Sequence, residues 1–210
     1  MIKAILFDMD GVLIDAKDWH YEALNQSLGL FGFKISRYDH LTIFDGLPTK
    51  DKLKLLSLQE GLPSKLHSFI NEMKQIYTID HIHEKCRPIF QHQYALSKLN
   101  KQGYKLAVCS NSVRKTIDLM MGKSELIQYL EFFLSNEDVK KSKPDPEIYI
   151  KAMARLELQP EECLILEDNQ NGVKAAKASG AHVLVIKTVL DVTYENIIEK
   201  ISHIEGGLHD

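Results

Sequence analysis

The chain begins with a nearly uninterrupted apolar run, Ile2–Phe7, that leads directly into Asp8-Met9-Asp10-Gly11. Such a run predicts a strand that is buried on both faces, as the strands of parallel sheets are. The two carboxylates follow where this strand should end, and a glycine there permits a sharp turn. Because ligands of open α/β sheets bind beyond the carboxyl ends of the strands, the two acids mark a candidate active site.

Further strand-like runs recur along the chain and alternate with helical patterns. This alternation predicts an α/β fold, a Rossmann-like doubly wound parallel sheet with right-handed crossovers. The strand-like runs are Lys105–Cys109, Leu130–Leu134, Cys163–Leu166 and His182–Ile186, and the helical patterns are Ile89–Lys101, Val113–Met121, Pro146–Arg155 and Gly172–Ala178.

One region shows helical periodicity and no buried strand. The simplest interpretation is a helical cap, residues 15–85, inserted after the first strand of a catalytic core formed by residues 1–14 and 86–210. An insert at that point is expected to hang over the carboxylates. The periodic apolar positions follow His20 at Leu24, Leu28 and Phe31, then at Leu53 and Leu56, then at Phe69, Met73 and Ile76, with helix starts expected at Asp51-Lys52-Leu53 and Pro63-Ser64-Lys65.

Composition excludes several classes of protein. With 210 residues, 44% hydrophobic and 26% charged, the chain fits a soluble globular protein rather than a disordered one. A net charge of −3 offers no basic surface, so we expect no nucleic-acid partner. No apolar run approaches the ~20 residues of a membrane span, and no signal peptide precedes the first strand. We expect a cytoplasmic protein, a monomer or weak homo-oligomer, whose cysteines are buried and reduced.

A second acidic cluster, Glu167-Asp168-Asn169, follows another apolar run. If both strands lie near the centre of the sheet, Asp8, Asp10 and Asp168 converge within a few ångströms. Clustered carboxylates repel one another unless a cation neutralises them, and oxygen ligands favour Mg²⁺. The alternatives are turn or cap chemistry for the first two acids, and an N-cap at Asn169 for the following helix.

Two further motifs suit an anion. Ser110-Asn111-Ser112 follows a strand and precedes a helix, so its backbone N–H groups and the Ser110 hydroxyl would suit phosphate oxygens. The alternative is an N-cap and nothing more. Lys143 is the last of several lysines and precedes Pro144, which restricts its backbone. This favours Lys143 as the lysine with a definite orientation, against the alternative of a solvated lysine surface.

These motifs, in this order, resemble those of the haloacid dehalogenase superfamily of phosphotransferases. The resemblance covers nearly the whole chain and is closest to the branch that contains β-phosphoglucomutase and small-sugar phosphatases, in which a helical cap follows the first strand. The motifs are Phe7-Asp8-Met9-Asp10-Gly11, Ser110-Asn111, Lys143-Pro144-Asp145-Pro146 and Glu167-Asp168-Asn169.

The resemblance implies a role for each motif residue. Asp8 is the expected nucleophile, which forms an aspartyl phosphate, and Asp10 is the expected general acid and base. Mg²⁺ is expected between the Asp8 carboxylate, the Asp10 carbonyl and Asp168, with Glu167 as a weaker contributor. The phosphoryl oxygens are expected at the residues of the other two motifs, Ser110, Asn111 and Lys143.

The cap is expected to select the substrate. His20 lies where the resembled mutases carry a histidine, although a satisfied core histidine is an equal alternative. Those mutases grip a second phosphate with an arginine where this chain has Thr49, and the neighbouring Lys50 offers only a point charge.

The leading hypothesis from the sequence is therefore an enzyme, a Mg²⁺-dependent phosphatase acting on a small phosphorylated metabolite such as a sugar phosphate. A hexose phosphate mutase is the second hypothesis. A non-catalytic binding or phospho-relay module is the third, and the presence of both Asp10 and Lys143 disfavours it.

Overall fold

A computed structural model describes residues 1–206. Residues 207–210, in the C-terminal stretch whose sequence predicts a frayed tail, lie outside the described part. The chain separates into two compact units: unit 1 contains residues 1–15 and the chain from Arg87 onward, and unit 2 contains Ala16–Cys86. No described helix is both long and apolar enough to cross a membrane.

Unit 1 is built on a parallel sheet of five strands in the order β3-β2-β1-β4-β5, which confirms the predicted fold class. Strand β1 is central, and the chain order runs outward from it in both directions. The carboxyl ends of β1 and β4 therefore meet where the strand order reverses, the place where ligands bind in such sheets. The strands are β1 (Ala4–Phe7), β2 (Lys105–Cys109), β3 (Phe132–Leu134), β4 (Cys163–Glu167) and β5 (His182–Val185).

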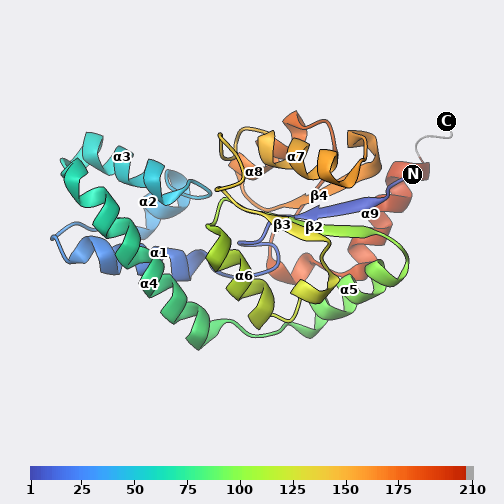
Figure 1. The fold of residues 1–210 in the computed structure, drawn as a ribbon, viewed down its shortest axis with the longest axis horizontal. Coiled ribbons are helices and arrows are strands. Elements are labelled where there is room, and N and C mark those ends of the chain that lie inside the picture. The colour runs from blue at the N-terminus through green and yellow to red at the C-terminus, as the bar shows by residue number, and fades with distance from the viewer. Residues whose placement is uncertain (207–210) are drawn as a thin grey trace. The chain divides into compact units, whose positions relative to one another are not determined.

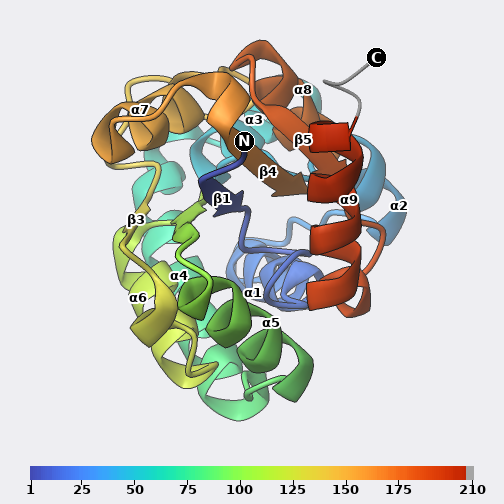
Figure 2. The same cartoon turned by 90° about the vertical axis from the view of Figure 1, so that its right-hand side faces the viewer.

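Helices cover both faces of this sheet. Figures 1 and 2 show α7 and α8 on one face, and α5 and α9 on the other. The helices of unit 1 are α5 (Phe90–Lys101), α6 (Arg114–Lys123), α7 (Glu147–Leu156), α8 (Gln170–Ala178) and α9 (Tyr194–Gly206), and 3-10 turns lie at Ile127–Tyr129, Pro160–Glu162 and Val189–Asp191.

Burial on both faces explains why β1 is apolar throughout. All of its residues are inaccessible to solvent, and Ala4 and Leu6 belong to the hydrophobic cluster beneath α7 and α8. Sheet strands alternate their side chains between faces, so the other two residues of β1 point towards the opposite layer. The cysteines are free and buried, as predicted, at Cys86, Cys109 and Cys163.

Unit 2 is helical, as the periodicity of this region predicted. Its core is formed by Leu24, Leu28, Leu53, Leu56 and Ile70 with apolar residues from the connecting segments. Its helices are α1 (Lys17–Gly29), α2 (Arg37–Thr42), α3 (Thr49–Glu60) and α4 (His67–Lys85), and a 3-10 turn lies at Ser64–Leu66.

The prediction of which face of α4 is buried is wrong. Phe69 and Ile76 are about half exposed, whereas the buried positions are Ile70, Lys74 and Thr78, with His81 and Ile82 further along. Successive positions on a helix lie 100° apart, so a stripe displaced by one residue points in a different direction. Phe69 instead packs edge-on against Phe31, with ring centroids 5.8 Å apart.

Candidate active site

Two buried acids stand at the ends of neighbouring strands. Asp8 follows β1, its N–H donates to the Leu166 carbonyl at 2.9 Å, and Glu167 is the last residue of β4. The chain then turns at Gly11, which has a φ of +90°, a conformation that favours glycine. The Gly11 N–H donates to the Ile14 carbonyl at 2.7 Å, so the turn that carries Asp10 is closed by its own backbone.

Lys143 joins the two acids. Its Nζ donates to Asp8 Oδ1 at 2.6 Å, to Glu167 Oε1 at 2.7 Å and to the Cys109 carbonyl at 2.7 Å, so each of its three N–H bonds has an acceptor. The side chain is only 3% exposed. Lys140 and Lys141 are exposed. The prediction that Lys143 is the oriented lysine of this segment is confirmed.

Charge within this cluster shifts the ionisation of both partners. Burial raises the pKa of Asp8 well above its ordinary value; Lys143 opposes this, and the carboxylates of Glu167, Asp168 and Asp10 add to it. Burial alone would lower the pKa of Lys143, but Asp8 and Glu167 outweigh it and raise that pKa. The lysine is therefore charged, and a further positive charge would help to keep Asp8 ionised.

Several groups hold the Glu167 carboxylate, and two of them come from residues distant in the sequence. Its Oε1 accepts the Tyr149 hydroxyl at 2.5 Å as well as Lys143, and its Oε2 accepts the Asp168 N–H at 3.2 Å. A side chain at Gly172 would not fit, since a Cβ there would lie 2.0 Å from Glu167 Oε1. Neither Tyr149 nor Gly172 was predicted from the sequence, because nothing in their spacing indicates that both reach one carboxylate.

Three carboxylates lie close enough together to form a candidate metal site. Asp8, Glu167 and Asp168 each offer an oxygen, and these oxygens lie within 4.8 Å of one another, so the expected convergence of Asp8 with Asp168 is found. An all-oxygen donor set with excess negative charge fits a hard divalent cation such as Mg²⁺. The side chain of Asp10 is not in this group; it accepts the Ser112 hydroxyl at 2.9 Å.

The Ser110–Ser112 segment connects the motifs to one another. Ser110 is buried and its hydroxyl accepts the Ser112 N–H at 3.1 Å. Asn111 makes a reciprocal pair with the backbone of Lys143: it accepts the N–H at 3.1 Å and donates to the carbonyl at 3.3 Å. The N-cap residue of α6 is Val113, so none of these side chains caps that helix. Asn169, in contrast, does cap α8 through the Gly172 N–H at 2.9 Å.

The predicted substrate residues of the cap all belong to unit 2. His20 is partly buried, and its Nδ1 lies 3.2 Å from Lys74 Nζ. Thr49 begins α3 and is partly buried, whereas Lys50 is exposed. The buried lysines of this unit are Lys52 and Lys74, which the sequence analysis did not single out.

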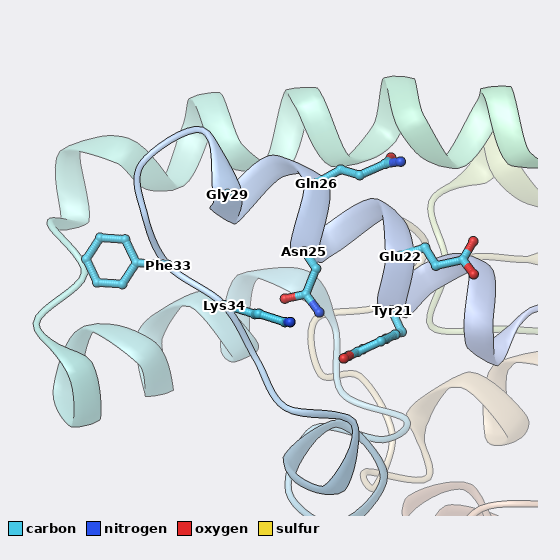
Figure 3. Close-up of a pocket in the computed structure, with 7 residues that line it drawn as sticks. All are labelled: Tyr21, Glu22, Asn25, Gln26, Gly29, Phe33 and Lys34. Atoms are coloured by element: carbon cyan, nitrogen blue, oxygen red, sulfur yellow. The ribbon is translucent and has the colours of Figure 1, made fainter.

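A shallow hollow of about 440 Å³ lies on unit 2, along α1 and the segment that follows it. Figure 3 shows its lining residues Tyr21, Glu22, Asn25 and Gln26 on α1, and Phe33 and Lys34 on the segment that follows. Tyr21 and Asn25 both donate to the Ile35 carbonyl, at 3.3 Å and 3.0 Å, so they support the fold of this segment. No residue predicted for the active site lines this hollow.

Comparisons with known proteins agree with this geometry. The family model described as "Haloacid dehalogenase-like hydrolase" matches residues 5–186. A curated relative, the "Phosphorylated carbohydrates phosphatase" of Thermotoga maritima, is 27% identical over 187 residues, which are 85% of this chain and 82% of the relative.

Two solved structures illustrate the similarity in fold. A β-phosphoglucomutase from Clostridium difficile is 21% identical, with a TM-score of 0.85 over 98% of this chain and 100% of that one. CbbY from Rhodobacter sphaeroides, in complex with xylulose-(1,5)bisphosphate, is 25% identical, with a TM-score of 0.80 over 88% of this chain and 86% of that one.

Proposed function

This chain belongs to the haloacid dehalogenase-like hydrolase family, as its motifs indicated, and we propose that it is a Mg²⁺-dependent phosphatase that hydrolyses a small phosphate monoester such as a sugar phosphate. The observation that carries this proposal is the buried ion pair between Lys143 and Asp8, beside Glu167 and Asp168. It gives one carboxylate the surroundings of a nucleophile and leaves its neighbours to bind a cation.

Asp8 is the nucleophile. One of its carboxylate oxygens attacks phosphorus, the P–O bond to the alcohol breaks, and an aspartyl phosphate forms on the enzyme. Lys143 stabilises the ionised carboxylate beforehand and the added phosphoryl charge afterwards, as a point charge that needs no rearrangement. Burial raises the pKa of Asp8, and the charge of Lys143 opposes that rise.

Asp10 transfers the protons. It protonates the leaving alkoxide in the first step and takes a proton from water in the second, when that water attacks the aspartyl phosphate and releases inorganic phosphate. The Ser112 hydroxyl, 2.9 Å from Asp10 Oδ2, orients this carboxylate. Only the two steps together return Asp8 to the free carboxylate and Asp10 to its protonated form.

Ser110 and Asn111 are assigned to the transferring phosphoryl group. They follow β2, next to Asp8 across the β1–β2 register, and Asn111 ties their segment to the backbone of Lys143. The residues that would hold Mg²⁺ are Asp8, Asp168, Glu167 and the backbone of Asp10, which fits the acidic donor set. Mg²⁺ supplies neutralisation of phosphoryl charge when it is bound.

Unit 2 is assigned as the cap that selects the substrate, with His20, Thr49 and Lys50 as its candidate residues. The second candidate function, hexose phosphate mutase, is supported by solved structures such as a putative β-phosphoglucomutase from Thermotoga maritima, 25% identical with a TM-score of 0.69. Thr49, where the resembled mutases carry an arginine, argues against it, because a mutase must hold a second phosphate and the neighbouring Lys50 offers only a point charge. The non-catalytic alternative does not fit a member of a hydrolase family.

The test is ³¹P NMR of the purified protein with Mg²⁺, pooled hexose, pentose and triose phosphates and a trace of hexose bisphosphate. A growing inorganic phosphate signal with one ester disappearing supports the phosphatase. Conversion of one ester into another without free phosphate supports the mutase instead. No change in any ester, with folded protein and Mg²⁺ present, contradicts both.

A further inference from the structure

Tyr149 contacts both partners of the central ion-pair network without any exposure to solvent. It lies on α7, its hydroxyl donates to Glu167 Oε1 at 2.5 Å, and its ring centroid lies 4.8 Å from Lys143 Nζ. Tyr149 and Glu167 are both 0% exposed. One side chain thus supports a carboxylate through its hydroxyl and an ammonium group through its aromatic face.

The hydroxyl of Tyr149 donates to Glu167 Oε1, and this acceptor is a fully buried carboxylate. The hydrogen bond is therefore charge-assisted, and such bonds contribute more to stability than bonds between neutral groups. Because Glu167 is not exposed to solvent, bulk water does not offset the loss of this donor.

The position of Lys143 depends on where Glu167 is held. Its ammonium group is divided between Asp8 Oδ1, Glu167 Oε1 and the Cys109 carbonyl. If Glu167 Oε1 loses its second donor, that carboxylate attracts the shared ammonium more strongly, and the bond to Asp8 weakens. Tyr149 thus acts on the nucleophile through two intervening side chains.

We propose that Tyr149 is a positioning residue for phosphoryl transfer, which fixes Glu167 and thereby keeps Lys143 on Asp8. The inference rests on the proposed function of Asp8 and goes beyond the residues that the motifs assign. Gly172 contributes to the same positioning of Glu167, since the absence of a side chain there leaves the space that the Glu167 carboxylate occupies.

Two substitutions distinguish the contribution of the Tyr149 hydroxyl from that of its ring. Tyr149→Phe retains the ring beside Lys143 and removes the donor, and Tyr149→Leu removes both. We expect kcat to fall about tenfold for Phe and about a hundredfold for Leu, from the loss of one charge-assisted hydrogen bond and then of the ring contact. KM for the ester should stay within about twofold, because Tyr149 acts on the enzyme's own carboxylate. Tyr194→Phe is the matched control, as its hydroxyl accepts from Gln102 on the surface.

A purely structural role gives a different result. In that case the variants lose thermal stability, but kcat at a temperature well below their melting transitions equals that of the wild type, and this overturns the proposal. A rise in KM as large as the expected fall in kcat, with kcat itself unchanged, overturns the proposal as well, since that pattern reports a lost substrate contact.

Gly172→Ala tests the same idea if Tyr149→Phe does not fold. Replacing glycine by alanine in a helix ordinarily stabilises it, and Gly122→Ala on α6 is the control, because nothing lies within 4 Å of a Cβ there. We expect Gly172→Ala to lower kcat by about tenfold or more at constant KM, as a displaced active-site group does. Unchanged kcat would contradict the proposal.

A crystal structure of Tyr149→Phe tests the positioning role independently of the proposed function. Displacement of Glu167 Oε1 and Lys143 Nζ away from their present contacts supports the positioning role even if no ester is turned over. If both atoms stay in place, the inference is wrong whatever the activity. A wild-type protein without phosphatase or mutase activity rejects the proposed function alone.

Discussion

Lys143 and Asp8 form a buried ion pair: Nζ lies 2.6 Å from Oδ1, and the two side chains are 3% and 7% exposed. The partners are separated by 135 positions in the sequence. Buried pairs of this kind are costly to break, because removal of one partner leaves the other charge uncompensated. The pair therefore connects the stability of unit 1 to the reactivity of its nucleophile.

Removal of the nucleophile should abolish turnover. We expect Asp8→Asn to lower kcat by at least about 10³-fold, because an amide cannot form the acyl phosphate while the remaining groups stay in place. The measurement is inorganic phosphate release under single-turnover conditions. Asp118→Asn, which neutralises an exposed aspartate on α6, is the control and should match the wild type. Undiminished turnover by Asp8→Asn would falsify the assignment.

Removal of the lysine should affect both activity and stability. Lys143→Met leaves Asp8 and Glu167 as adjacent buried carboxylates, so we expect the free energy of unfolding to fall by about 3–5 kcal/mol and kcat by about 10²-fold or more. Denaturant unfolding and steady-state kinetics measure these effects. Lys141→Met, at an exposed neighbouring lysine, should change the free energy of unfolding by less than about 0.5 kcal/mol. Similar behaviour of the two variants would mean that the buried pair has no special role.

Metal removal should be reversible and measurable without substrate. EDTA should abolish phosphate release and Mg²⁺ should restore it. Mg²⁺ at about 100 times its dissociation constant should stabilise the wild type by about 2.7 kcal/mol, since only the folded acids form the site. Thermal unfolding with increasing Mg²⁺ measures this. We expect no such increase for Asp168→Asn, and an unchanged response would exclude Asp168 as a ligand.

The buried His40 of unit 2 should make stability depend on pH. Burial, and then the neighbouring Lys52, lower the pKa of His40 from 6.5 to about 4. Above pH 6.5 the ring is neutral in both states and the full stability is present. Between 6.5 and about 4 the unfolded chain binds the proton more strongly, so stability falls as pH falls, by up to about 3 kcal/mol.

Denaturant unfolding at several pH values between 7 and 4.5 measures this dependence. His40→Phe keeps an aromatic ring beside Tyr21 and should flatten the curve relative to the wild type. His203→Phe, at an exposed histidine of α9, should leave the slope unchanged. If the wild type and His40→Phe have the same slope, His40 does not titrate as described.

The strands of unit 1 could be predicted closely from the sequence. Strand β2 has the predicted bounds, Lys105–Cys109, and the other four differ at their ends by a few residues. Strands buried on both faces need continuous apolar runs, so polar residues occur only where the strand ends. The same rule predicted the positions of Asp8 and Glu167, one after and one at the end of a central strand.

The buried faces of helices, and the elements near the C-terminus, were harder to predict. Helix α9 was not predicted, although Ile197 and Ile201 are buried one helical turn apart. On α4, apolar residues occur on more than one face, and packing against α1 selects the side that includes Lys74. A sequence shows which faces are apolar, but the neighbouring helix decides which one is buried.

The sequence by itself determined the parallel sheet, the helical insert and the order of the acidic, hydroxyl and lysine motifs, because these follow from local patterns of burial and turning. Only the tertiary structure decided that Lys143 bridges Asp8 and Glu167, and that Tyr149 and Gly172 define the place of that carboxylate. These contacts join three segments far apart in the chain, at Asp8, at 143–149 and at 167–172. Their geometry depends on strand register and helix packing, which no local pattern encodes.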